Sequence, residues 1–90
     1  MKYDLKREEL MRRRLRYLIQ TEYNGVADFH ECLYGSRPDA VHLEKFNWFL
    51  KRGAINWDFM ALVCEKTKVS KIPLGRLLDM DINNEELFSD

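Results

Sequence analysis

The ten residues from 46 to 55, FNWFLKRGAI, constrain the fold of this chain more than any other stretch. Three apolar side chains recur there at i, i+3 and i+4, namely Phe46, Phe49 and Leu50. This spacing places them on one side of a helix that faces an apolar core. Lys51 and Arg52 follow in the last turn, where cations favour the negative end of the helix dipole. Gly53 then stands where a chain commonly leaves a helix through a positive φ.

The spacing of apolar residues predicts helices along the rest of the chain as well. We expect helices over about residues 4–23, 26–34 and 39–52, a fourth that begins just after Asn56 and ends before a turn at residues 69–72, and a fifth over about residues 73–78. Their inward residues are Met11, Leu15, Leu18 and Ile19, then Phe29, Cys32 and Leu33, then Leu43, Phe46, Phe49 and Leu50, then Phe59, Leu62 and Val63, and finally Leu74, Leu77 and Leu78. No segment shows the strict alternation of a half-buried strand. The predicted fold class is therefore all-α, a compact bundle of about five helices.

The residues between these segments have the chemistry of helix ends. Asn24-Gly25 is a typical end for the first helix, since glycine tolerates a left-handed backbone. Ser36 or Asp39 can cap the third helix, and Asn56 can cap the fourth. Pro73 is expected at the first position of the last helix, where its missing N–H costs nothing.

Composition and charge indicate one small domain with an uneven charge distribution. Ninety residues with 46% apolar side chains argue against disorder. The net charge is zero, yet residues 1–16 carry seven basic and three acidic side chains, and residues 45–76 carry seven basic and two acidic ones. The stretch from Asp79 onward has five acidic side chains and no basic one. We therefore expect a domain over residues 1–80, with basic surface that can bind phosphates, and an acidic tail over residues 81–90.

Several functional classes find no support in the sequence. No apolar run approaches the roughly 18 residues of a membrane span, and the N-terminus lacks the apolar stretch of a signal peptide, so we expect a cytoplasmic protein. Cys32 and Cys64 lie on apolar sides of helices, which predicts buried, reduced thiols. His30 and Cys32 are two residues apart, which disfavours a zinc site. No catalytic set or phosphate-binding loop occurs, so we predict no enzyme and no cofactor.

The order of these segments resembles the lambda-repressor-like family, the phage repressor and Cro-type helix-turn-helix domains, over about residues 10–80. Residues 26–35 look like the second helix and tight turn of that family. Phe46-x-x-Phe49-x-x-Arg52-Gly53-x-Ile55 is similar to a V-x-x-W-x-x-R-G-x-I signature of its Cro-like branch. The close of the domain resembles the family in five residues: Val69, Ser70, Leu74, Leu77 and Leu78. One departure is the span from Gly35 to Phe46, eleven residues where the family has about six.

The resemblance implies that the helix over about 39–52 enters the major groove of DNA. The expected DNA-binding residues are Arg37, His42, Lys45, Asn47, Trp48, Lys51 and Arg52. Asparagine and lysine suit base edges, while the arginines and Lys51 suit phosphates. Four arginines of the first helix form either a phosphate clamp or an ordinary solvated face: Arg12, Arg13, Arg14 and Arg16. Trp48 can pack on sugars or on a second subunit, whereas Trp57 is expected in the core.

Two functions follow from this resemblance, and they belong to different classes. The first is a small sequence-specific DNA-binding transcriptional regulator of the phage or mobile-element repressor type, acting as a homodimer on a two-fold operator. Its dimer contact would come from residues 1–10 or from Ile82 and Leu87-Phe88. The second is a helix-turn-helix-shaped module that binds a protein instead of DNA, as an antirepressor, antitoxin or host-defence inhibitor. The neutral net charge, the acidic residues Asp28 and Glu31 and the longer turn favour the second.

Overall fold

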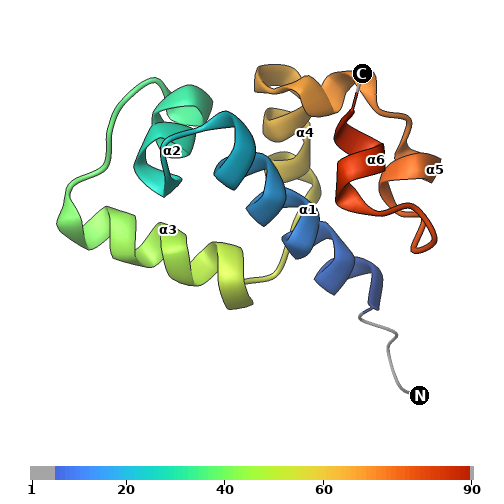
Figure 1. The fold of residues 1–90 in the computed structure, drawn as a ribbon. Helices are drawn as coiled ribbons and strands as arrows, with labels where there is room; N and C mark the ends of the chain where they lie inside the picture. Colours follow the sequence, from blue (N-terminus) through green and yellow to red (C-terminus); the bar gives the residue numbers. More distant parts are fainter. Residues whose placement is uncertain (1–5, 90) are drawn as a thin grey trace, which may run out of the picture.

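A computed structural model describes residues 6–89 of the chain, and these residues form helices joined by short connections (Figure 1). The elements are α1 (Lys6–Glu22), α2 (Val26–Tyr34), α3 (Ala40–Arg52), α4 (Trp57–Lys66), a 3₁₀ turn η1 (Lys68–Lys71), α5 (Leu74–Leu77) and α6 (Asn84–Phe88). No strand occurs within residues 6–89. The all-α prediction is confirmed, and the first four helices begin and end close to the expected residues.

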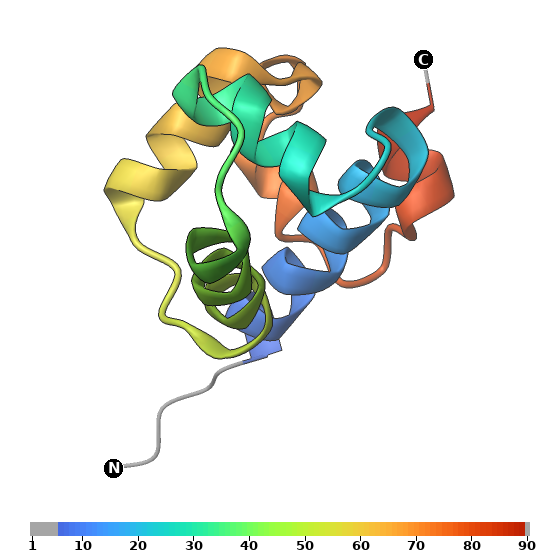
Figure 2. The same ribbon diagram turned by 90° about the vertical axis from the view of Figure 1, so that its left-hand side faces the viewer.

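The helices enclose one core, and α3 lies along one side of it. α3 packs against α1 and α2, α4 packs against α2 and η1, and α6 packs against α1. Figures 1 and 2 show α3 on the opposite side of the molecule from η1 and the end of α4. The most deeply buried apolar side chains come from α1, α2, α4 and α5: Leu15, Leu18, Phe29, Val63 and Leu77. One side of α3 therefore contacts the core while the other faces away from it.

Side-chain caps and left-handed glycines set the helix ends. The carboxylate of Asp39 accepts a hydrogen bond from the backbone N–H of His42 at 2.8 Å, so Asp39 is the cap of α3. Asn56 caps α4 in the same way through the N–H of Phe59, also at 2.8 Å. Gly25 and Gly35, which flank α2, have φ angles of 123° and 82°. Both caps match the sequence prediction. Gly25 has the expected positive φ, but it precedes α2 as its cap, three residues after α1 ends at Glu22.

Gly53 ends α3 for a different reason from the one we predicted. Its φ is −70°, a conformation open to any residue, so the expectation of a positive φ is wrong. A Cβ atom at this position would lie 2.6 Å from the ring atom Cδ1 of Phe49 and 2.9 Å from the Phe49 carbonyl oxygen. Glycine is required because the chain turns directly across Phe49, which itself packs against the core.

Two predictions at the start of α5 are also wrong. Pro73 precedes the helix as its cap, with ψ at 142°, instead of occupying its first position. Leu74, expected inside, is 53% exposed. α5 has only four residues, about one helical turn, so only one of its leucines, Leu77, points into the core.

The segment expected as an acidic tail packs on the core. α6 is capped by Asn83 and buries Leu87 and Phe88, and the Phe88 ring stacks on Tyr17 of α1 with centroids 5.6 Å apart. The boundary predicted at residue 80 therefore does not coincide with a break in the packing. Leu87 and Phe88 are 5% and 8% exposed, so the prediction that they supply a dimer contact is wrong.

The arginine run of α1 divides into two buried and two exposed side chains. Arg14 is 2% exposed, and its guanidinium donates to the Leu77 carbonyl at 3.1 Å, the Asp79 carbonyl at 2.8 Å and the Asn84 side-chain oxygen at 2.8 Å. Burial lowers the pKa of Arg14, while the carboxylate of Asp79 opposes that shift. These bonds tie α1 to the segment between α5 and α6.

Arg12 makes a second tie at the other side of α1. It is 8% exposed and donates to Glu8 at 2.7 Å and to the carbonyl of Gly53. Neither Arg12 nor Arg14 can serve in a phosphate clamp, because both guanidinium groups are buried and bond to acceptors within the molecule. That prediction is wrong for both, and only Arg13 and Arg16 remain exposed.

Replacement of Arg14 tests the tie between α1 and the C-terminal segment. We expect Arg14→Ala to lower the free energy of unfolding by about 2–4 kcal/mol, because it leaves buried carbonyl groups without a donor. Urea denaturation followed by circular dichroism measures the change. Arg13→Ala is the matched control, an exposed arginine one residue away, and should change stability by no more than about 0.5 kcal/mol. Equal effects in the two variants would contradict the assigned role of Arg14.

A second pair of variants tests the crowding at Gly53. We expect Gly53→Ala to cost about 1–3 kcal/mol of unfolding free energy, because the new methyl group meets the ring and backbone of Phe49. Gly75→Ala serves as the control, since a Cβ there meets nothing within 4 Å. Because the backbone of Gly75 is helical, alanine should be neutral or stabilising by up to about 1 kcal/mol. A neutral Gly53→Ala would show that close approach does not explain this glycine.

Candidate nucleic-acid interface

One side of α3 is fixed by an aromatic cluster centred on Phe46. The Phe46 ring lies 6.2 Å from that of Phe29, 6.4 Å from that of Phe59 and 5.1 Å from that of His30, measured between centroids. Phe49, one turn further along, meets Phe59 edge to face at 4.9 Å. Rings in such arrangements contribute about 0.5–1.5 kcal/mol per pair beyond the area they bury. The rotation of α3 about its own axis is therefore well determined.

The opposite side of α3 is exposed along its whole length. Residues three and four apart share a helix face, and one such row consists of Val41, Lys45, Trp48 and Arg52. Glu44 and Lys51 flank Trp48 on the side nearer to α1, and all six side chains are exposed. Trp48 is 61% exposed and lies at the centre. This outward face of α3 carries three cations against one anion, on a rod about 20 Å long at 1.5 Å per residue.

α1 adds basic side chains next to this outward face. Arg13, Arg16 and Gln20 form one exposed row on α1. A hollow of about 320 Å³ separates α1 from α3, and Arg16 and Gln20 line one wall while Asn47 and Lys51 line the other. The cations of α1 thus continue across the hollow to Lys51.

The structure brings together only some of the predicted DNA-binding residues. Lys45, Trp48, Lys51 and Arg52 share the outward face, whereas Asn47 is half-buried at the wall of the hollow. His42 lies beside a hollow also lined by Tyr34 and Phe46, and Lys45 stands where the outward face meets this hollow. Its Nδ1 lies 2.7 Å from the Asp39 carboxylate, and the hydrogen bonds from His42 hold the pKa of Asp39 below its usual value.

Arg37 is exposed, but its charge is already balanced. Its guanidinium pairs with the carboxylate of Asp28 and with that of Glu31 at 3.1 Å. These hydrogen bonds lower the pKa of Asp28 and raise the pKa of Arg37. A phosphate would have to displace two carboxylates of α2, so Arg37 is a poorer phosphate ligand than Lys51 or Arg52.

Trp57 is the residue that sequence reasoning placed most wrongly. It was expected in the core, yet it is 77% exposed, the first residue of α4 directly after the cap Asn56. The inward stripe of α4 is Phe59, Met60 and Val63. Trp57 lies three residues before Met60, so the two share a side of α4, and both line a groove between α1, α4 and α5. The spacing therefore gave no signal of its exposure.

The two cysteines and the remaining titratable groups form no second site of comparable size. Cys32 and Cys64 are free and half-buried, and the Cys32 sulfur lies 3.4 Å from the Tyr23 hydroxyl. Burial and this contact raise the pKa of Tyr23. Within residues 6–89, no three His, Cys, Asp or Glu side chains lie where they could hold a metal ion.

None of the described helices has the length and apolar character needed to cross a membrane. Comparisons with protein-family models, with curated proteins and with solved structures found no match to this chain.

Proposed function

We propose that this protein is a small sequence-specific DNA-binding regulator of the repressor type, with α3 as the helix that enters the major groove. The proposal follows the resemblance to the lambda-repressor-like family, and it includes action in the cytoplasm, on a phage or mobile-element operator, without a catalytic step or a cofactor. The observation that carries it is the outward face of α3, which is cationic, exposed and opposite the aromatic cluster that fixes the helix.

Within this proposal the basic residues divide into two roles. Lys45 lies in the middle of α3, where a side chain on a groove-bound helix meets base edges, and its ammonium group can donate to guanine acceptors. Lys51 and Arg52 at the end of α3, with Arg13 and Arg16 on α1, suit backbone phosphates and so set the register. Trp48 supplies apolar contact to sugars or thymine methyl groups. Arg37 and His42 are weaker candidates for a DNA contact, because each is already paired with a carboxylate of the protein.

The alternative function, a module that binds a protein, is favoured by the acidic surface of α2. Asp28 and Glu31 lie next to the turn that leads into α3. Carboxylates there would oppose a phosphate backbone brought close to the start of α3. A partner with basic side chains would suit this surface, and its binding would not require the cations at the end of α3.

Removal of Lys51 and Arg52 together tests the phosphate role. Wild-type protein is first used to select its preferred duplex from a random library, and affinity is then measured by fluorescence anisotropy over a salt series. We expect Lys51→Ala/Arg52→Ala to abolish measurable binding at physiological salt. At low salt, the slope of log affinity against log salt should fall by about 2, since each phosphate contact contributes about 0.9.

The matched control for this experiment removes two cations from the other side of the molecule. Lys66 at the end of α4 and Lys71 in η1 are both exposed. The end of α4 and η1 lie away from α3 (Figure 1). Lys66→Ala/Lys71→Ala has the same change in net charge and should keep the wild-type salt slope. Unchanged duplex binding in Lys51→Ala/Arg52→Ala, or a library selection without any shared sequence, would favour the protein-binding alternative.

Lys45 provides a separate test of base recognition. We expect Lys45→Ala to lose preference at a single position of each half-site, worth about 1–3 kcal/mol of discrimination, while other positions keep theirs. Repeating the selection with the variant measures this directly. Lys51→Ala should instead weaken binding to all sequences by a similar factor. A uniform loss in Lys45→Ala would remove it from the base-reading role.

A further inference from the structure

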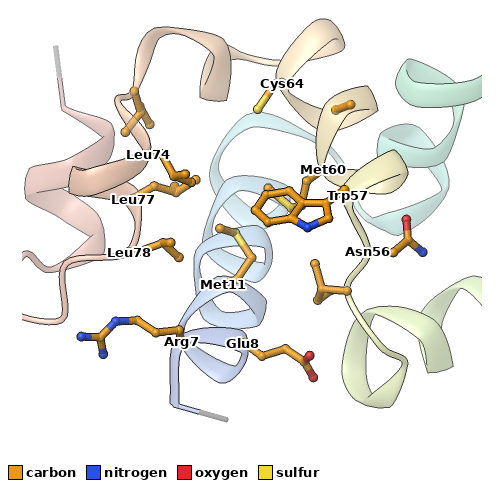
Figure 3. Close-up of a pocket in the computed structure, with 13 residues that line it drawn as sticks. Arg7, Glu8, Met11, Asn56, Trp57, Met60, Cys64, Leu74, Leu77 and Leu78 are labelled. Atoms are coloured by element: carbon orange, nitrogen blue, oxygen red, sulfur yellow. The ribbon is translucent and has the colours of Figure 1, made fainter. Parts of the chain in front are cut away.

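A groove of about 620 Å³ lies between α1, α4 and α5, and no residue of α3 lines it (Figure 3). Its floor is made of core side chains, since Met11, Met60 and Leu77 are buried. Figure 3 shows Trp57 on the α4 side and Leu74 on the α5 side, and both of these side chains are exposed. Protein interiors are close-packed, so an open hollow that reaches the core is a candidate binding site.

The size and the walls of the groove suit a small molecule better than a protein chain. Small-molecule sites enclose about 300–1,000 Å³ and are lined mainly by apolar side chains with a few polar groups. Thirteen residues line this groove, and the polar ones among them are Arg7, Glu8 and Asn56. A stable protein interface uses about 20–30 residues on each side. The groove therefore fits a small ligand whose body is largely apolar.

The apolar walls favour a flexible chain over a rigid ring system. Leucine, isoleucine and methionine side chains supply most of the lining, and Trp57 is its one aromatic residue. Methionine adapts its shape to its neighbours, and Met11 and Met60 both belong to the floor. An alkyl chain laid on this floor would lose contact with water along its length, which is favourable for each methylene group.

One charge at the edge of the groove is available to a ligand. Glu8 accepts a hydrogen bond from Arg12 at 2.7 Å, so its carboxylate is already paired. Arg7 is exposed, and within residues 6–89 its guanidinium contacts the sulfur of Met80 and no carboxylate. A thioether is a weak acceptor, whereas a carboxylate can accept two hydrogen bonds from an arginine. Figure 3 shows Arg7 at the α1 edge, below Leu78.

We propose that this groove binds a medium-chain fatty acid, with its alkyl chain on the floor between Met60 and Leu77 and its carboxylate on Arg7. The apolar floor accounts for the chain, and the cation at the edge accounts for the acid in place of a neutral lipid. The site does not depend on the proposed DNA-binding function, because no residue of α3 lines the groove.

Titration of the full chain with decanoate, below the concentration at which it forms micelles, tests the site. Trp48→Phe leaves Trp57 as the single tryptophan, and its emission should shift to shorter wavelength as decanoate covers the exposed ring. Affinity should rise about fourfold for each methylene added between octanoate and decanoate. Trp57→Phe, which keeps Trp48 on α3, should show no shift.

The head group is tested with decanol, which has the same chain and no charge. Wild-type protein should bind decanoate about fivefold more tightly than decanol, at the upper end for an exposed ion pair. Arg7→Gln should remove this preference and leave decanol binding unchanged. Arg13→Gln, an exposed arginine of α1 that does not line the groove, is the matched control and should keep the preference.

The chain position is tested by filling the groove. Ala61 lines it and is exposed, so Ala61→Phe should place a ring in the hollow and weaken decanoate and decanol alike by at least about tenfold. Glu65→Phe, one turn further along α4 and outside the groove, is the control and should bind as wild type does. Circular dichroism establishes that both variants are folded.

The two cysteines give a second measurement of the same position. Cys64 lines the groove and Cys32 does not, and both thiols are free. Bound decanoate should slow alkylation of Cys64 by iodoacetamide and leave that of Cys32 unchanged, as followed by mass spectrometry.

The outcomes separate the ligand site from the proposed function. The site is overturned if decanoate neither shifts the emission of Trp57 nor protects Cys64, or if Ala61→Phe binds decanoate as tightly as wild type. Equal affinity of wild-type protein for decanoate and decanol overturns the assignment of an acid. A protein that binds decanoate in the groove but selects no duplex sequence keeps this site and loses the DNA-binding function.

Discussion

The packing of Phe46 determines what α3 can offer to a partner. Its ring contacts aromatic side chains from α2 and α4 as well as from its own helix, so three helices share one cluster. An α-helix turns about 100° per residue, and a helix held at Phe46 and Phe49 has little freedom to rotate. Because Phe46 points into the core, Trp48 and Arg52, on the other side of α3, face solvent. The outward face of α3 is therefore a consequence of core packing.

The arginines of α1 show that burial, more than residue type, decides the role of a charge. Arg14 lies inside because three oxygen acceptors converge on its guanidinium, which offsets the loss of hydration. The acceptors lie between the last residue of α5 and the first residue of α6, so Arg14 holds α1 and the C-terminal segment in register. Arg13 and Arg16 meet no such acceptors and keep their charge at the surface. Arg12 and Arg14 therefore stabilise the fold, while Arg13 and Arg16 remain exposed and available to bind an anion.

The sequence predicted the structural features that depend on residues close together in the chain. It did not predict those that depend on contacts between distant segments. The periodic stripes predicted the extents of α1 to α4, and the cap residues Asp39 and Asn56 were identified because capping acts within three residues. The buried role of Arg14 and the helix α6 were missed because each depends on a partner brought near by folding. Gly53 was placed correctly at the end of α3, but for the wrong reason, because spacing does not reveal its crowding against Phe49. For the candidate interface, the exposed row on α3 followed from its apolar stripe. The pairing of Arg37 with α2 depended on the path of the turn, which spacing cannot show.

The two exposed tryptophans belong to surfaces with opposite requirements. A surface that meets a polyanion needs net positive charge, while exposed apolar area beside a groove is typical of a protein-interaction or ligand-binding site. Trp48 stands among the cations of the outward face of α3. Trp57 stands beside a groove between α1, α4 and α5 whose walls are mostly apolar. The same residue type therefore contributes to two surfaces of different chemistry, because the side chains around it differ.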